Sequence, residues 1–92
     1  MEVRVNIAPE KEREFNQWYN KVHVPEVLTV PGFLSGRRFQ RVSGDEIKYM
    51  TLYELESLDV LKSEAYKKVR GWGEFESCIL EESWNVYRQI YP

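Results

Sequence analysis

The 92-residue sequence contains one cysteine, one histidine and no long hydrophobic run. Cys78 alone cannot form an internal disulfide, and with a single histidine it leaves too few soft ligands for a structural zinc site. The sequence has no run of about 18 apolar residues that could span a bilayer, and its first residues lack the apolar segment of a secretory signal. We therefore expect a cytoplasmic protein with no membrane association and no bound metal.

An excess of positive charge is also missing. Thirteen Lys and Arg face fifteen Asp and Glu, which gives a net charge of −2. Because the basic residues neither predominate nor cluster, the surface needed to neutralise phosphates is absent, and nucleic acid is not an expected partner. A chain of this length holds one modest core, and with no linker or repeat in it we expect residues 1–92 to form a single domain.

Aromatic residues, by contrast, are abundant. The chain has thirteen of them, including three Trp and six Tyr. So many rings are difficult to bury around one small core, so some of them are expected to line a pocket or a subunit interface.

The first third of the chain predicts a strand followed by a helix. Apolar and polar residues alternate over residues 2–7, which is the period of a strand with one buried face. Pro9 suits the first turn of a helix, and an apolar stripe with helical spacing follows it. Pro25 disfavours helical geometry at the preceding residue, so the helix is expected to end or kink there, before a reversal at residues 31–32. The stripe consists of Phe15, Trp18, Tyr19 and Val22.

Residues 33–42 and 47–55 are rich in strand-forming side chains and predict a hairpin with its tip at residues 43–46. Counting across this turn pairs Arg37 with Leu52, Arg38 with Thr51 and Phe39 with Met50. Both faces of the hairpin are then substantially apolar, although a one-residue bulge would exchange some positions. One face carries Phe33, Phe39, Met50 and Leu52, and the other carries Leu34, Val42, Ile47, Tyr49, Tyr53 and Leu55.

The last third predicts a second helix and a closing strand. Ser57 is a plausible N-cap, and Gly71 follows the end of the helical pattern. Residues 72–80 are compatible with a short helix that uses Phe75, and alternation over residues 84–90 predicts the last strand. The apolar positions of the second helix are Leu58, Leu61, Ala65 and Val69.

The resulting order, β-α-β-β-α-β, predicts an α+β fold of the ferredoxin-like type, with a four-stranded antiparallel sheet and two helices on one face. The other sheet face would expose an apolar patch larger than monomers usually tolerate. Two sheets packed face to face about a two-fold axis would bury both patches, so we expect a homodimer.

Four segments together resemble a known superfamily. They are WYNKVHVPE at residues 18–26, PGF at residues 31–33, RRF at residues 37–39 and YMTLYEL at residues 49–55. With these segments the chain resembles the dimeric α+β barrel superfamily, and within it the EthD-like group. The resemblance implies a homodimer with a small-molecule pocket between helices and sheet in each subunit. It also implies that the histidine at position 23 is a candidate for proton transfer.

His23 is the leading catalytic candidate, because imidazole both accepts and donates a proton near neutral pH. Its aromatic neighbours Trp18 and Tyr19 could wall a partly dry cavity, and Glu26 could orient the ring. A structural role, with the imidazole donating to a main-chain carbonyl at the helix end, is the alternative.

The strands supply further candidates. Arg38, in the middle of a strand, could stabilise an oxyanion or form an ordinary ion pair, and Arg37 takes its place if the register is shifted. Tyr49 and Tyr53 could offer hydroxyls to a substrate or belong to the core. Phe39 would complete an apolar wall. Trp72, between two glycines, is a candidate mobile lid or a packed ring after a helix end. The candidate catalytic residues are His23, Arg38 and Tyr53, and the candidate substrate-binding residues are Trp18, Tyr19, Phe39, Tyr49 and Trp72.

Three functions compete. The first is a cofactor-independent enzyme in which His23 moves a proton during isomerisation, dehydration or cyclisation of a small aromatic, lactone or polyketide-like molecule. The second, implied by other members of the superfamily, is a monooxygenase that works without cofactor or with haem, which would require His23 as the iron ligand. The third is a carrier that binds a hydrophobic metabolite without transforming it.

Overall fold

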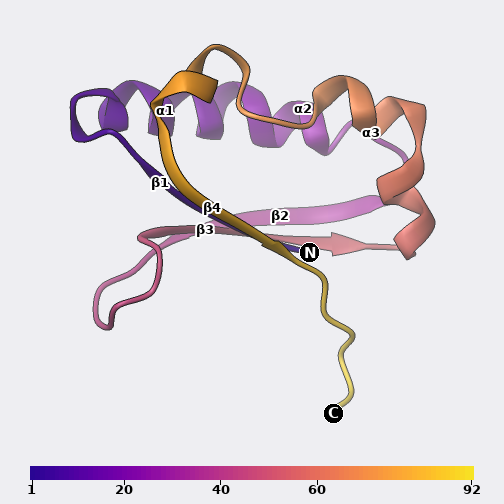
Figure 1. The fold of residues 1–92 in the computed structure, drawn as a ribbon. Helices are drawn as coiled ribbons and strands as arrows, with labels where there is room; N and C mark the ends of the chain where they lie inside the picture. The colour runs from indigo at the N-terminus through magenta and orange to yellow at the C-terminus, as the bar shows by residue number, and fades with distance from the viewer.

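In the computed structural model, which describes residues 1–92, a layer of helices covers one face of a four-stranded antiparallel sheet (Figure 1). The strands are β1 (Glu2–Ile7), β2 (Phe33–Gln40), β3 (Tyr49–Leu55) and β4 (Ile79–Asn85), and their order in the sheet is β2-β3-β1-β4. The α-helices are α1 (Glu12–Trp18), α2 (Val24–Val27) and α3 (Glu64–Val69). This α+β arrangement is compatible with the predicted ferredoxin-like fold.

The central strand β1 shows why the helices lie on one side. Val3, Val5 and Ile7 are buried, whereas the alternate residues of the strand are only partly buried. β1 pairs antiparallel with β3 on one side and with β4 on the other. The alternation therefore turns one apolar row towards the helices, as the sequence pattern predicts.

The hairpin of β2 and β3 confirms the predicted register. Arg37 pairs with Leu52, Arg38 with Thr51 and Phe39 with Met50. Both strands are shorter than expected, because β2 ends at Gln40 and β3 begins at Tyr49. Val42 lies in the connecting loop and is 97% exposed. A bulge between Phe33 and Ser35 also shifts the start of β2.

This bulge corrects the predicted faces. Phe33 is buried in the core and Leu34 is 63% exposed, the reverse of the predicted arrangement. An extra residue in one strand exchanges the two faces for every residue before it, so the regular alternation predicts the wrong side for this pair.

The first helix does not end at Pro25, which was one of the two predicted outcomes. Helix α1 continues into a π-helical turn, η2 (Tyr19–His23), and then into α2, with Pro25 inside the first turn of α2. The amide of Val24 donates to the carbonyl of Tyr19, five residues earlier. The wider turn tolerates proline, which has no N–H to donate and whose ring collides with the carbonyl four residues earlier in a regular helix.

The π-turn also changes which residues face the core. Phe15, Tyr19, His23 and Val27 are buried at intervals of four residues, and Val22 is exposed. A turn with more residues than 3.6 keeps positions four apart on one side. His23, which the sequence places at the edge of the stripe, is therefore within it.

The predicted second helix is split into two short pieces. A 3-10 segment, η3 (Leu58–Lys62), is followed by α3, and Ser63 between them caps α3 by accepting a hydrogen bond from the amide of Tyr66. The fully buried residues are Val60 and Tyr66. Of the predicted stripe, Leu61 and Val69 are partly buried against the core, and Leu58 and Ala65 are exposed. A single 3.6-residue period cannot describe a segment that changes geometry halfway.

The carboxyl-terminal third has a short helix, as predicted, at η4 (Gly73–Cys78), with Phe75 buried. The closing strand is displaced, because β4 begins at Ile79 and ends at Asn85, and residues 86–92 run away from the sheet (Figure 1). Glu81 and Glu82 obscure the pattern, since acidic residues are unusual inside a strand. They pair with Asn6 and Val5 of β1.

The turn before β2 fits the predicted Pro31-Gly32 reversal. Gly32 has a φ of +98°, and a Cβ there would lie 2.2 Å from Cγ2 of Val60. Only glycine avoids both the backbone strain and the collision. None of the helices combines the length and the apolar character needed to cross a bilayer.

Candidate functional site

The residues around His23 form an aromatic cluster under the first helix. His23 is 5% exposed and its imidazole stacks on Trp18, with ring centroids 4.7 Å apart and planes at 13°. The edge of Tyr19 lies 5.0 Å away, and the Trp72 ring centroid is 6.4 Å away. Four of the predicted site residues are thus brought together, and the π-turn puts His23 among them.

Burial determines the protonation of His23. The pKa of His23 is lowered to about 4. The larger cause is the loss of hydration on burial, and the smaller is the positive charge of Arg38. No protein group forms a hydrogen bond with the imidazole, and Glu26 is exposed rather than oriented towards it. At pH 7 the ring is neutral, so it is a proton acceptor and not a proton donor.

Arg38 reaches the same cluster from β2. Its partner across the hairpin is the buried Thr51, so Arg38 lies on the helix side of the sheet. Its guanidinium donates to the side-chain oxygens of Asn16 and Asn20, both at 2.9 Å, and lies 4.1 Å from the centroid of Tyr19. The buried Nε atom has no partner.

Tyr49 and Tyr53 lie two residues apart on β3 and point to the same side, as the strand period requires. Tyr49 donates to Oε1 of Glu12 at 2.6 Å and accepts from Asn16, which connects it to the Arg38 network. Tyr53 is 3% exposed and its hydroxyl has no hydrogen-bond partner. Burial, together with the adjacent Tyr19, raises the pKa of Tyr53, so its hydroxyl keeps its proton.

Two buried polar atoms, Nε of Arg38 and the hydroxyl of Tyr53, have no hydrogen-bond partner. In protein interiors nearly all such atoms have one. The hydroxyl of Tyr53 is held in place because its ring packs against Gly36, where a Cβ would lie only 2.9 Å from the ring. Buried donors without partners are available to an oxygen atom that enters the site.

Phe39 lies apart from this cluster. Its partner across the hairpin is Met50, and its side chain is 44% exposed on the sheet face that the helices do not cover. The expected register already puts it on the face opposite to Arg38, so the two residues do not share a cavity.

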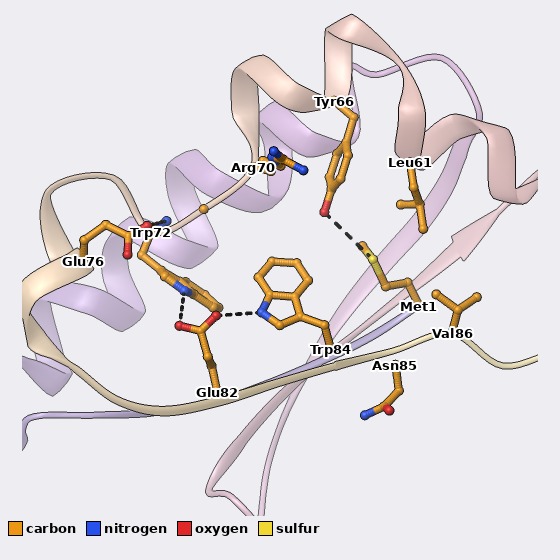
Figure 2. Close-up of a pocket in the computed structure, with 11 residues that line it drawn as sticks. Met1, Leu61, Tyr66, Arg70, Trp72, Glu76, Glu82, Trp84, Asn85 and Val86 are labelled. Carbon is orange, nitrogen blue, oxygen red and sulfur yellow. Dashed lines mark hydrogen bonds between the residues drawn. The ribbon is translucent and has the colours of Figure 1, made fainter.

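The open cavity lies beyond Trp72, between α3 and β4 (Figure 2). It has a volume of about 540 Å³, within the range of small-molecule sites. Of the predicted site residues only Trp72 contributes to it. The lining residues are Met1, Leu61, Tyr66, Arg70, Gly71, Trp72, Glu76, Glu82, Trp84, Asn85 and Val86.

Glu82 connects two of the indoles in the cavity. Its carboxylate accepts from Nε1 of Trp72 at 3.1 Å and from Nε1 of Trp84 at 2.8 Å, as Figure 2 shows. Sequence reasoning missed Glu82 and Trp84 because β4 was expected to begin later. A strict alternation from Ile79 would place both on the other face. The register shift between β1 and β4 at Asn6 and Ile7 turns them to the helix side, where they pair with Val5 and Val3.

Trp72 separates the cavity from His23. Its ring is 5.6 Å from that of Trp84 on one side and 6.4 Å from that of His23 on the other. The glycines that flank it have φ values of +100° and +55°. Such positions adopt backbone conformations that other residues avoid, and the Trp72 side chain between them is 2% exposed.

Comparison with known proteins adds a family but no activity. No group of three or more His, Cys, Asp or Glu side chains is arranged to hold a metal ion. No curated protein and no solved structure shows a significant match to the chain. A family model described as "Domain of unknown function (DUF4286)" matches residues 1–72, which include His23, Arg38, Tyr53 and Trp72. Since this match spans most of the sequence, the chain belongs to the DUF4286 family.

Proposed function

We propose that this chain is a small-molecule enzyme of the EthD-like type. It would bind a hydrophobic or aromatic compound in the cavity beside Trp72 and use His23 to move a proton. The observation that carries the proposal is a cavity of about 540 Å³ that only the ring of Trp72 separates from a buried, neutral histidine. Isomerisation, dehydration and cyclisation of a lactone or polyketide-like compound all require such a transfer next to a carbonyl group.

The chemistry follows from the protonation states. A neutral His23 removes a proton from the carbon beside a carbonyl, which yields an imidazolium and an enolate. Because the pKa of His23 is about 4, the imidazolium is a strong enough acid to return the proton readily to another position. No cofactor is needed for this exchange.

The enolate oxygen requires donors. Nε of Arg38 and the hydroxyl of Tyr53 are buried and have no partner, and both would strengthen their interaction as negative charge develops. Substrate reaches these groups in our proposal after Trp72 rotates about its flanking glycines. The indole then closes the cavity against water.

A homodimer of the dimeric α+β barrel type is part of the proposal. The uncovered sheet face carries Leu34, Phe39 and Leu52, whose side chains are all exposed, with Met50 beside them. Apolar side chains clustered on one face favour contact with a second, identical face.

The haem alternative fits less well. An iron ligand must face a space that admits a porphyrin, but His23 does not line the cavity and is stacked on Trp18. A carrier without catalytic activity is favoured by the same observation, because the cavity has a complete lining of its own without His23.

A proton-exchange measurement tests the proposal. Small aromatic lactones and ketones are incubated with the protein in D₂O, and deuterium incorporation beside the carbonyl is followed by NMR. We expect His23→Ala to lower the exchange rate at least about 100-fold, the usual contribution of a general base, while ligand-induced thermal stabilisation persists. Trp84→Ala should remove the stabilisation, and Tyr87→Ala, in the exposed tail, is the matched control.

Unchanged exchange in the His23→Ala protein would contradict catalysis by this residue and support the carrier. Thermal stabilisation that is unchanged by Trp84→Ala would contradict the cavity as the binding site.

A further inference from the structure

The charged groups around the cavity indicate which ligands it binds. Resting on the proposed binding function, we infer that the cavity takes a small aromatic carboxylic acid, with the carboxylate held by Arg70 and Tyr66 and the ring packed on Trp84.

The first step concerns the acidic residues of the cavity. Both oxygens of Glu82 are occupied by the two indole N–H groups. Glu76 accepts from the main-chain amide of Trp72 at 3.2 Å. The two carboxylates are therefore engaged by donors of the protein itself, and they are poorly placed to capture a cation.

Arg70 is in the opposite situation. It lines the cavity at the end of α3, its side chain is exposed, and it takes part in no ion pair or side-chain hydrogen bond. A guanidinium without a partner presents two parallel N–H donors that match a carboxylate. Arg70 is consequently the one charged side chain of the lining that has no hydrogen-bond partner in the protein.

Tyr66 adds a second donor close to Arg70. The two residues are four apart at the end of α3, and the charge of Arg70 acts on the phenol, opposing the larger effect of burial that raises the pKa of Tyr66. The only hydrogen bond of the hydroxyl is a weak one, 3.9 Å to Sδ of Met1. Figure 2 shows the ring of Tyr66 extending from α3 into the cavity that Arg70 also lines. A carboxylate between them would accept from a phenol and a guanidinium.

The remaining wall suits an apolar body. The indole of Trp84 stands between Glu82 and Tyr66, and the side chains of Leu61, Met1 and Val86 surround the same space (Figure 2). An aromatic ring on Trp84 would keep the carboxylate of the ligand on the α3 side, away from Glu82. The position of the ring and that of the charge are thus both specified.

Three probes with the same ring test the inference: 2-naphthoate, 2-naphthylmethanol and 2-naphthylmethylamine, titrated by calorimetry and by tryptophan fluorescence at pH 7.5. We expect the naphthoate to bind about 10-fold or more tightly than the alcohol, since a hydrogen-bonded charge pair contributes that much, and the amine to bind most weakly. Arg70→Gln should abolish the preference for naphthoate over the alcohol, and Tyr66→Phe should reduce it. Arg88→Gln, in the tail, should leave it unchanged.

The outcomes separate the two proposals. If the amine binds best, or if Arg70→Gln leaves the preference intact, the inferred ligand class is wrong although the cavity still binds small aromatic compounds. If none of the three probes binds, the binding function proposed above fails as well.

Discussion

At the scale of single residues, the histidine illustrates how a fold changes the properties of a side chain. An exposed imidazole has a pKa of about 6.5, but that of His23 is lowered to about 4 by burial among aromatic rings and by the charge of Arg38. Folding therefore disfavours its protonated form. The same burial that makes it a neutral base for catalysis makes it sensitive to acid.

We predict that stability falls as the pH is lowered from about 6.5 to 4. Between these pH values the unfolded chain binds a proton at His23 and the folded protein does not. The free energy of unfolding therefore decreases as the pH is lowered. The full difference is about 3 kcal/mol, from 1.36 kcal/mol per pKa unit. Urea unfolding at several pH values should show this loss.

A His23→Phe variant, which keeps a ring in the stack, is the matched protein for this experiment. The difference in unfolding free energy between wild type and variant should decrease as the pH is lowered, because His23 is the only histidine. Parallel pH curves for both proteins would contradict the lowered pKa.

At the scale of elements, short helices depend on their ends. Helix α3 has only six residues and cannot be stable alone, so a side chain that satisfies a free amide at its start matters. Ser63 accepts from the amide of Tyr66 at 3.2 Å, whereas Ser57, before η3, makes no side-chain cap hydrogen bond. Since Tyr66 and Arg70 are carried by α3, its start also positions the wall of the cavity.

Replacing the two serines should have unequal effects. Ser63→Ala should lower the unfolding free energy by about 1 kcal/mol, the typical loss for an N-cap, and Ser57→Ala should change it little. Chemical denaturation of the two variants gives the comparison directly. Equal losses would show that the capping hydrogen bond of Ser63 contributes nothing particular to α3.

At the scale of the whole molecule, the sheet has two unlike faces. One is covered by the helices, and the other exposes Leu34, Phe39 and Leu52 on β2 and β3 beside the polar row of β1. Salt bridges of Arg4 with Glu2 and of Arg37 with Glu54 border this patch. An apolar centre with charged margins is the composition of many protein interfaces.

We predict that the protein sediments as a dimer at micromolar concentration and that Leu52→Glu converts it into a monomer, because a carboxylate buried without a partner in the interface is strongly unfavourable. Leu58→Glu, which changes an exposed leucine on the helix side, should leave the dimer intact. Analytical ultracentrifugation distinguishes the species. A monomeric wild type would contradict the proposed assembly.

The features that depend on local periodicity could be predicted from the sequence. The alternation in β1, the turn at Gly32 and the pairing of Phe39 with Met50 follow from neighbouring residues and from counting across one loop. The stripe containing Tyr19 was also recognisable. These features require no information about distant parts of the chain.

The errors occur where the geometry departs from the regular period. Three features change which residues face the core: the π-turn before Pro25, the bulge after Phe33 and the break at Ser63. Glu82 was missed for a related reason, because the register shift between β4 and β1 turns it towards the helices. There its carboxylate accepts from Trp72, ten residues away in the sequence, and from Trp84, two residues away. Pattern reading assumes a constant period and cannot detect such shifts.

The residue order was thus sufficient for the succession of strands and helices, for the hairpin register and for the choice of His23 as a candidate. Which polar groups lose their water, and which indole separates the imidazole from the cavity, depended on the packing of α3 and β4 against the rest of the domain. Burial and unpartnered donors arise from contacts between segments far apart in the chain. Hydration, charge and access are properties of those contacts, so they emerge when the chain is folded.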